Sequence, residues 1–208
     1  MTTRRALRIG LTGPIACGKS TVAGWLAEAG AVVVDADRVA RSVTQPGEPA
    51  HDDVLAAFGS RVRAADGTLD RSALATIVFG HPDRLRALER IVHPAVRPRI
   101  MGEIAEAEAD GATLVAIEAI KLVEGGLAEL CDEIWLVTCD PAEQLRRLVA
   151  RGADEDDAAA RMGAQGDIRE RLAPASTRVV DTTGSPEEAR RRVAVALDRA
   201  RAELDRGR

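Results

Sequence analysis

Short apolar runs alternate along the chain with longer stretches in which apolar residues recur every three or four positions. The short runs are typical of strands and cover residues 7–12, 31–35, 114–117, 133–139 and 177–181. The stretches between them have the periodicity of amphipathic helices. Because strands that alternate with helices indicate a parallel sheet, the pattern predicts an α/β fold built on five parallel strands.

The second of these strands ends in a pair of carboxylates. Its three consecutive valines, residues 32–34, have no polar break, which is typical of a strand buried on both faces. Asp35 and Asp37 follow at its end, and the spacing of Val39 and Val43 predicts a helix behind them.

The region from about residue 50 to 110 contains no convincing strand. Apolar spacing predicts helices around residues 54–58 and 74–78, and a further helical stretch over residues 85–104 that we expect His93-Pro94 to interrupt. Because the region is longer than a simple crossover between parallel strands requires, we interpret it as a helical insertion.

Two later helices carry start signals. Asp140, Pro141 and Glu143 supply an N-cap, a proline at the first helical position and a glutamate at the third. Ser185 and Glu188 have the spacing of a second capping box. We therefore expect helices to begin at residues 141 and 186.

Composition narrows the class of protein. At 208 residues the chain fits one α/β core with a small insertion, and with only 2% aromatic residues the core must be aliphatic. The net charge of −4 without a polycationic tract argues against general nucleic-acid binding. The sequence shows neither a membrane span nor a signal peptide, and its three cysteines form no C-x-x-C pair. We expect a cytoplasmic protein with no membrane or nucleic-acid partner.

The segment from Gly13 to Ser20 matches the phosphate-binding pattern G-x-x-x-x-G-K-[ST] and lies between a predicted strand and a predicted helix. Its glycines let the backbone curl so that successive N–H groups, with those of the helix N-terminus, face an anion. The residues expected to bind the nucleotide are Gly13, Pro14, Ile15, Ala16, Cys17, Gly18, Lys19, Ser20 and Thr21.

Two side chains of this loop have specific chemistry. Lys19 would reach the β- and γ-phosphates of a nucleoside triphosphate, and the Ser20 hydroxyl would bind Mg²⁺. Only two of the 29 basic residues are lysines, and a flat guanidinium cannot replace a compact ammonium between phosphates. The alternative, a glycine-rich turn that binds nothing, explains the lysine less well.

The carboxylate pair and an arginine cluster are further candidates. Asp35 and Asp37 would point the same way in an extended chain, where one could take a proton from a substrate hydroxyl. They could instead cap the next helix. Arg146, Arg147 and Arg151 either lie on a solvated helix face or supply cations from a lid that closes over the phosphates.

Taken together, these motifs resemble those of the dephospho-coenzyme A kinase family over most of the chain. Besides the phosphate loop, the matching segments are residues 34–37 with Arg41, 45–49, 58–59, 66–71 with Leu74, 78–79, 88–94, 144–148 with Arg151, and 164–165. The aspartate triplet and the Leu-Glu-x-Ile-x-His-Pro stretch are the most specific of them.

The resemblance implies transfer of the γ-phosphate of ATP to the ribose 3′-hydroxyl of dephospho-coenzyme A, with Mg²⁺ as cofactor. Asp37 would be the general base, with Lys19 and Arg147 also catalytic. Arg41, His93 and Arg151 would join Asp37 in binding the acceptor substrate.

The resemblance also implies an organisation of the chain as a single P-loop kinase domain over residues 1–208. The nucleotide-binding core would comprise residues 1–44, 111–141 and 168–208, with the acceptor-binding insertion at 45–110 and a small helical lid at 142–167. We expect a monomer, with a homo-oligomer as the alternative.

Several residues raise separate questions. Cys17 stands where the family usually has serine, and a thiol among inward N–H groups is expected to have a lowered pKa and to be oxidisable, unless it is merely an inert small residue. Lys121 stands close to the third strand, either near the cleft floor or at the surface. His51 and His81 are expected at the surface.

Other functions fit less well. Another P-loop kinase of small molecules or nucleosides would share the loop, and so would a catalytically inactive nucleotide-binding module. Residues 181–184 match the D-x-x-G pattern of a GTPase switch, but they lie late in the chain. The chain also contains no asparagine to form a guanine-reading Asn-Lys-x-Asp motif.

Overall fold

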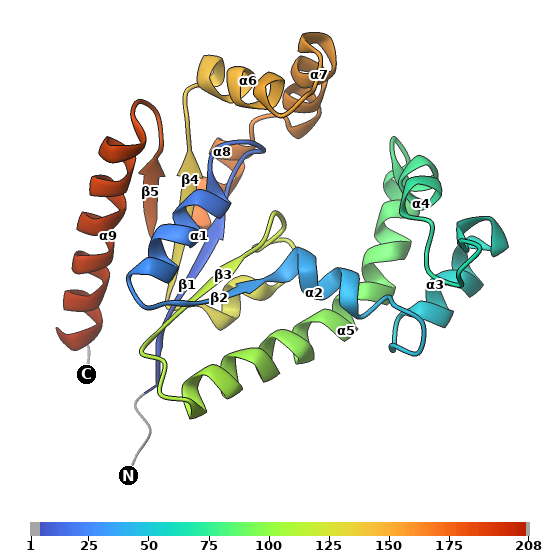
Figure 1. Cartoon of the computed structure of the whole chain (residues 1–208), viewed down its shortest axis with the longest axis horizontal. Coiled ribbons are helices and arrows are strands. Elements are labelled where there is room, and N and C mark those ends of the chain that lie inside the picture. Colours follow the sequence, from blue (N-terminus) through green and yellow to red (C-terminus); the bar gives the residue numbers. More distant parts are fainter. Residues whose placement is uncertain (1–4, 207–208) are drawn as a thin grey trace. The chain divides into compact units, whose positions relative to one another are not determined.

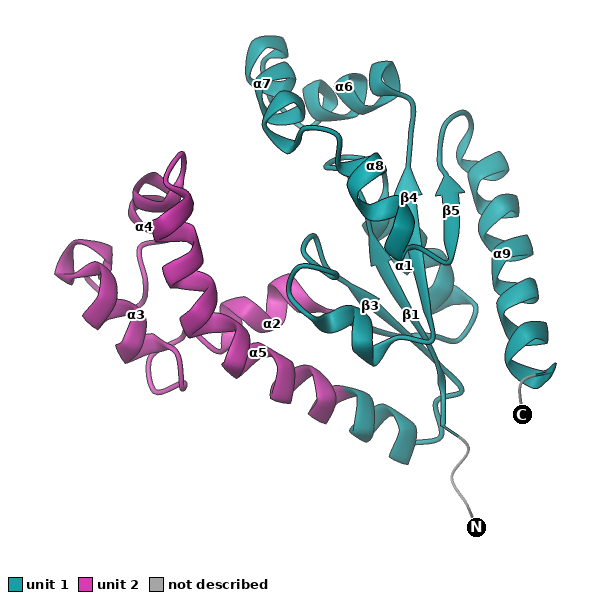
Figure 2. Cartoon of the chain, turned by 180° about the vertical axis from the view of Figure 1, so that it is seen from behind, with its two compact units in different colours: residues 1–34, 104–208 teal, residues 35–103 magenta. Residues whose placement is uncertain are grey.

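The computed structural model describes residues 5–206 (Figure 1). The chain divides into two compact units, which Figure 2 distinguishes by colour. Unit 1 comprises residues 1–34 and 104–208, and unit 2 comprises residues 35–103. No helix of the described range combines the length and the apolar character that a membrane crossing requires.

A five-stranded sheet is the framework of the described chain, with its strands in the order β2-β3-β1-β4-β5. The strands are β1 (Leu7–Thr12), β2 (Val32–Asp35), β3 (Leu114–Glu118), β4 (Glu133–Thr138) and β5 (Arg178–Asp181). Pairing is parallel between β1 and β3, β1 and β4, and β4 and β5. The predicted five-stranded parallel fold is confirmed, and each strand boundary lies within a residue or so of its prediction.

Helices α1 (Lys19–Glu28) and α9 (Pro186–Arg206) cover one face of this sheet (Figure 1). Their apolar positions pack against the strands in a core that includes Ile9, Leu26, Trp135 and Leu197, all buried. Helix α8 (Ile168–Leu172) packs on the opposite face against Leu136. Aliphatic residues and one tryptophan thus build the core, in line with the composition.

Two further helices follow β4 in unit 1. They are α6 (Pro141–Ala150) and α7 (Glu155–Gln165), and short 3₁₀ turns stand at η2 (Leu127–Leu130) and η3 (Ala173–Ala175). The predicted start signals are confirmed: Asp140 accepts a hydrogen bond from the Ala142 N–H, and Ser185 and Glu188 cap α9 reciprocally.

Unit 2 is helical, as predicted. It holds α2 (Ala36–Ser42), α3 (His51–Phe58), η1 (Ser60–Val62), α4 (Arg71–Val78) and most of α5 (Pro82–Ala109), which ends in unit 1. Its apolar core contains Val54, Phe58, Val62, Leu69 and Leu74.

The predicted interruption at His93-Pro94 is wrong, because α5 continues through both Pro94 and Pro98. Each proline removes one backbone donor. Burial of Val96 and Ile100, on one face beyond Pro94, favours helix over the break that local sequence suggests.

Two burial predictions are also wrong. Strand β2 lies at the edge of the sheet, and its Val32 is 41% exposed rather than buried. Valine is enriched in β-strands in general, so the run predicted a strand without distinguishing an edge strand from a central one. His51 is only 5% exposed, and its ring bonds to Asp52 and to the Gly67 carbonyl, whereas His81 is exposed as expected.

Candidate nucleotide-binding site

The predicted phosphate loop connects β1 to the N-terminus of α1, the context that the motif requires. Gly18 takes a left-handed conformation, with φ of 85°, directly before α1 begins at Lys19. Gly13 has φ of 137°, and a Cβ atom there would lie 2.1 Å from the Val137 carbonyl oxygen of β4. Both motif glycines are therefore required by their backbone conformation. At Gly13 the close approach of the Val137 carbonyl also excludes a side chain.

Ala16 is the one non-glycine residue with positive φ within residues 5–206, at 57°. This conformation costs about 1 kcal/mol for an alanine. The methyl group is buried in a small core with Leu148 of α6 and Ala158 of α7. Packing on the α6–α7 segment therefore offsets the strain and helps to keep the loop curled.

Two glutamines of the same segment hold the loop backbone at Ile15. The Ile15 N–H donates to Gln165 Oε1, and Gln144 Nε2 donates to the Ile15 carbonyl, each at 2.9 Å. A hollow of about 310 Å³ lies beside Pro14, with Gln144, Gln165 and Arg169 in its wall. Sequence reasoning assigned no role to the glutamines, since their only signal was their place in the matched segments.

Lys19 lies at the centre of the loop with its side chain buried. Its Nζ donates to the carbonyls of Gly13 and Pro14, both at 2.9 Å. The ammonium thus lies against the loop that leads into the N-terminus of α1, where the helix dipole is positive. This arrangement concentrates positive charge where the motif predicts phosphate binding.

Ser20 makes a contact that the sequence did not predict. Its hydroxyl donates to Glu118 Oε1 at 2.7 Å, at the C-terminal end of β3. No cluster of three or more His, Cys, Asp or Glu side chains able to hold a metal occurs in the described range. A hydroxyl and a carboxylate side by side nevertheless fit Mg²⁺, which is usually bound through one or two protein oxygens together with water and phosphates.

Arg147 of α6 lies beside the loop. Its guanidinium donates to Thr182 Oγ1 and to the Thr182 carbonyl, at 3.0 and 2.8 Å, and to Glu143 at 2.8 Å. A Cβ atom on Gly18 would be 3.5 Å from Arg147 Nη1. The guanidiniums of Arg146 and Arg147 lower the pKa of Glu143 to about 2, so this carboxylate stays ionised and fixes Arg147 next to the loop.

The other two arginines of the cluster are more exposed than Arg147. Arg151 caps the C-terminus of α6 and is exposed. Arg146 is also exposed and pairs with Glu143. Arg146 and Arg151 thus lie at the solvated surface of α6, whereas Arg147 is partly buried between Glu143 and Thr182.

The candidate acceptor residues of unit 2 lie on its helices. Asp35 is the N-cap of α2 and accepts from the Arg38 N–H at 2.9 Å, which confirms its capping role. Asp37 follows in the first helical turn and is exposed. The expected extended geometry of this pair is wrong, because the chain becomes helical at Ala36. Arg41 lies in the last turn of α2 with its Nη2 3.8 Å from Asp35 Oδ2, and His93 is half-buried in α5.

Cys17 is buried beneath the loop, with its sulfur 2.6 Å from that of Cys139. The Cys139 thiol, assisted by the positive charges of Arg169 and Lys19, lowers the pKa of Cys17. The predicted direction is thus confirmed, although the main cause is a second cysteine rather than the loop amides.

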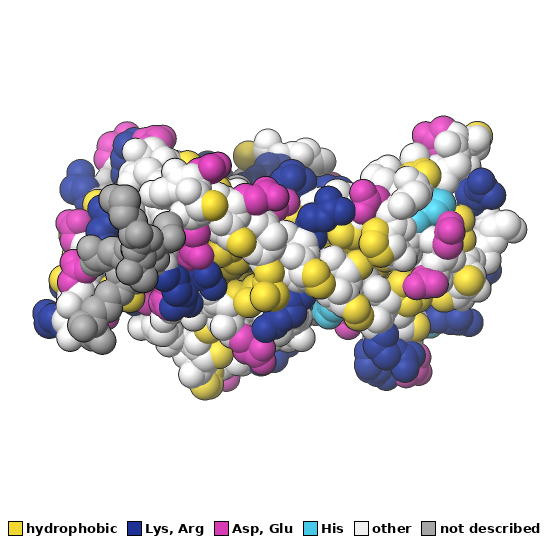
Figure 3. All heavy atoms as spheres, turned by 90° about the horizontal axis from the view of Figure 1, so that it is seen from below, with side chains coloured by type: hydrophobic (Ala, Val, Ile, Leu, Met, Phe, Trp, Pro, Cys, Tyr) yellow, Lys and Arg dark blue, Asp and Glu magenta, His cyan; other side chains and the backbone are white. Residues whose placement is uncertain are grey.

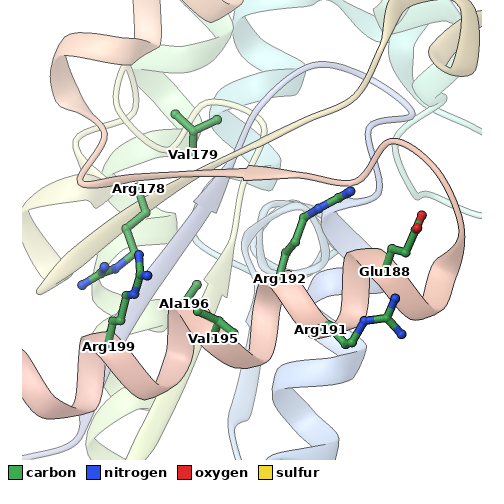
Figure 4. Close-up of a pocket in the computed structure, with 8 residues that line it drawn as sticks. All are labelled: Arg178, Val179, Glu188, Arg191, Arg192, Val195, Ala196 and Arg199. Carbon is green, nitrogen blue, oxygen red and sulfur yellow. The ribbon is translucent and has the colours of Figure 1, made fainter.

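An arginine-lined hollow of about 590 Å³ lies between β5 and α9 (Figure 4). Arg178 there pairs with Glu133, and Arg192 donates to the carbonyls of Asp181 and Thr183, so both cations already serve the fold. On the face shown in Figure 3, basic and acidic side chains are interspersed, consistent with the small net charge.

A curled loop between a central parallel strand and a helix, with a buried lysine and a hydroxyl–carboxylate pair, defines the class of P-loop kinases. Solved structures agree at the level of the fold. A shikimate kinase from Acinetobacter baumannii superposes with a TM-score of 0.53 at 16% identity, covering 95% of this chain and 94% of that one.

Sequence comparison then narrows the class. The family model described as dephospho-CoA kinase matches residues 7–187. The dephospho-CoA kinase of Geobacter metallireducens is 44% identical, covering 95% of this chain and 98% of that protein. That of Streptomyces avermitilis is 47% identical, covering 90% of each. The crystal structure of TT1252 from Thermus thermophilus has a TM-score of 0.79 at 37% identity, covering 97% of this chain and 99% of that one. The chain belongs to the dephospho-CoA kinase family, and the resemblance stated from its motifs is confirmed.

Proposed function

We propose that this protein transfers the γ-phosphate of ATP to the ribose 3′-hydroxyl of dephospho-coenzyme A, giving coenzyme A and ADP. The observation that supports this most directly is the phosphate loop with Lys19 at its centre and the loop backbone held by Gln144 and Gln165. Phosphoryl transfer depends mainly on such positioning and on charge stabilisation. The acceptor is proposed from the family to which the chain belongs.

On the donor side, the loop N–H groups and Lys19 would hold the β- and γ-phosphates. To do so Lys19 exchanges its hydrogen bonds to the Gly13 and Pro14 carbonyls for bonds to phosphate oxygens. Arg147, already fixed beside Gly18, would stabilise the negative charge on the phosphoryl group as it is transferred.

Ser20 and Glu118 are the residues proposed to hold Mg²⁺, directly or through its water shell. When bound, the ion would neutralise charge on the phosphates. Glu118 would orient the Ser20 hydroxyl, a role that its 2.7 Å contact already performs.

On the acceptor side, Asp37 is proposed as the general base that takes the proton of the 3′-hydroxyl. Arg41, His93 and Arg151 are proposed to bind the acceptor, residues 45–110 to form its site, and residues 142–167 to act as a lid. We further propose that the protein works in the cytoplasm as a monomer on this small molecule, without a nucleic-acid or membrane partner.

A coupled assay of ADP release tests the proposal. ATP and Mg²⁺ are supplied with dephospho-coenzyme A, with nucleosides, with nucleoside monophosphates, or with no acceptor. We expect dephospho-coenzyme A to raise ADP release well above the other three conditions, and the product to co-elute with coenzyme A. Chelation of Mg²⁺ should abolish this. Preference for a nucleoside or its monophosphate would assign another kinase, and ADP release that no acceptor stimulates would contradict the proposal.

A further inference from the structure

Two cysteines that are far apart in sequence meet beneath the phosphate loop. Cys17 stands inside the loop and Cys139 follows the last residue of β4, 122 positions along the chain. Their sulfur atoms are 2.6 Å apart, and both residues are fully buried. A contact this short leaves no room for another heavy atom between the sulfurs, and only a small further approach separates it from a covalent bond.

We propose that Cys17 and Cys139 are a modification site, at which a peroxide forms a reversible disulfide that holds the phosphate loop to the end of β4.

The backbone around both sulfurs is already tied together. Thr182 Oγ1 lies 2.8 Å from the Cys17 carbonyl oxygen and 3.1 Å from that of Thr138, the neighbour of Cys139, so one hydroxyl bridges the two chain segments. Arg147 holds this hydroxyl in place with a further hydrogen bond. The disulfide therefore requires side-chain rotation and little movement of the backbone.

The pair also has the chemistry for the reaction. A hydrogen bond from the Cys139 thiol, with Lys19 and Arg169 nearby, favours the thiolate form of Cys17, which is the nucleophile. The same contact and burial raise the pKa of Cys139. Cys131 differs from Cys17, since burial and Asp132 raise its pKa to about 12. Cys131 therefore serves as an internal control.

The reaction balances in two steps. The Cys17 thiolate attacks the O–O bond of hydrogen peroxide, which leaves a sulfenic acid on Cys17 and releases one water after protonation. The Cys139 sulfur then attacks the Cys17 sulfur, expels the hydroxyl as a second water with the Cys139 proton, and completes the S–S bond. The two thiols lose two electrons and two protons, which the peroxide takes up.

Burial sets the rate of this reaction. Because both cysteines are 0% exposed, peroxide reaches them only when the loop region opens locally. The hollow beside Pro14, whose wall includes Arg169, brings solvent to this side of the loop. Oxidation should accordingly be slower than that of an exposed thiolate.

The disulfide would weaken nucleotide binding. The bond would fix residue 17 between strained Ala16 and left-handed Gly18, so the loop N–H groups could no longer adjust to the phosphates. We expect the dissociation constant for ATP to rise about tenfold on oxidation and to return on reduction.

Peptide mapping of the full-length protein tests the site directly. The protein is treated with hydrogen peroxide, free thiols are alkylated, and cross-linked peptides are identified by mass spectrometry. We expect a Cys17–Cys139 peptide that dithiothreitol removes, with Cys131 recovered in alkylated form. Because a bond across 122 residues restricts the unfolded chain, the oxidised protein should melt at least about 5 °C higher. A cross-link through Cys131, irreversible oxidation of Cys17 alone, or three thiols left free would overturn the proposal.

Two variants separate this site from general damage. Cys139→Ala should abolish both the cross-linked peptide and the reversible loss of ATP binding, whereas Cys131→Ala should retain both. Equal peroxide sensitivity of wild type and Cys139→Ala would contradict the proposal. The binding readout rests on the proposed nucleotide site, but the peptide map and the melting shift do not, so a failure of the proposed function is recognised separately.

Discussion

The phosphate loop and the helical unit 2 are held in different ways. Side chains from several elements fix the loop backbone, with Gln144 and Gln165 at Ile15 and Thr182 at Cys17. Unit 2 instead has a small apolar core surrounded by half-buried aliphatic side chains, and its Phe79 is 80% exposed. A site that must match a phosphate atom by atom thus has a dense set of backbone contacts, whereas unit 2 is held mainly by apolar packing.

The proposed catalytic and binding residues divide along the same line. Lys19, Ser20 and Arg147 belong to unit 1, and Asp37 and Arg41 to unit 2. On this comparison, substitutions in the phosphate loop should act by removing a charge or by disturbing a fixed backbone. Substitutions in unit 2 should act by removing a single functional group or by weakening its packing.

The largest effect is expected from Lys19→Ala. Loss of the ammonium removes the charge closest to the expected phosphates, and we expect kcat/KM with dephospho-coenzyme A to fall about 10³-fold. Steady-state kinetics measures this, with circular dichroism to confirm folding.

The chain offers one matched control, since Lys121 is its only other lysine and is exposed. Lys121→Ala should change kcat/KM by less than about threefold, as expected of a surface residue outside the described site. Comparable losses in both variants would contradict the role given to Lys19.

Gly13→Ala tests the backbone argument. With φ of 137° and the Val137 oxygen 2.1 Å from the added Cβ, it should lower the free energy of unfolding by about 3 kcal/mol. Gly47→Ala in unit 2 has φ of 85° but open space, so about 1 kcal/mol is expected. Urea denaturation compares them, and equal losses would remove the contrast between the two regions.

Asp37→Asn tests the proposed base. Without a carboxylate to accept the proton, kcat should fall about 10²-fold while stability is kept, because Asp37 is exposed. Asp35→Asn is the control, since asparagine caps a helix as well as aspartate does. A kcat of Asp37→Asn equal to that of wild type would assign proton transfer to another group.

His51→Ala addresses packing in unit 2. Its ring is buried and bonded to the Gly67 carbonyl at 3.0 Å, so its loss should cost about 2 kcal/mol of unfolding free energy. His81→Ala, at an exposed position, should stay within about 0.5 kcal/mol of wild type. Thermal denaturation of both variants decides whether the ring stabilises unit 2.

The same two regions explain what the sequence could predict. The strands, the loop and the caps at Asp140 and Ser185 follow from local chemistry, and all were predicted. Continuation of α5 through Pro94 and the burial of His51 depend on distant packing, which periodicity does not encode.

The site shows the same limit. Motif spacing identified Lys19, Ser20 and Cys17, but the side chains that contact Ser20 and Cys17 come from remote segments of the chain. Glu118 is 98 residues from Ser20, and Cys139 is 122 residues from Cys17. A carboxylate at the end of a strand was a weak signal for Glu118. Only the strand order, which puts β3 and β4 on either side of β1, brings these residues to the loop.

The smallest effect concerns Glu143, whose pKa Arg146 and Arg147 lower from 4.5 to about 2. Since the folded state holds its proton less tightly than the unfolded state, this stabilisation is complete above about pH 4.5 and is lost as the pH falls towards 2. Solvent screening keeps it below about 1 kcal/mol.

Urea denaturation between pH 5 and about pH 2.5 should therefore show the wild type converging on Glu143→Gln as the pH falls. Glu48→Gln, which breaks one exposed ion pair to Arg99 in unit 2, is the matched control and should differ less from wild type. A constant difference between wild type and Glu143→Gln across this range would mean that the carboxylate stabilises the fold through packing rather than charge. The two arginines would then not be what holds Glu143 in place beside the loop.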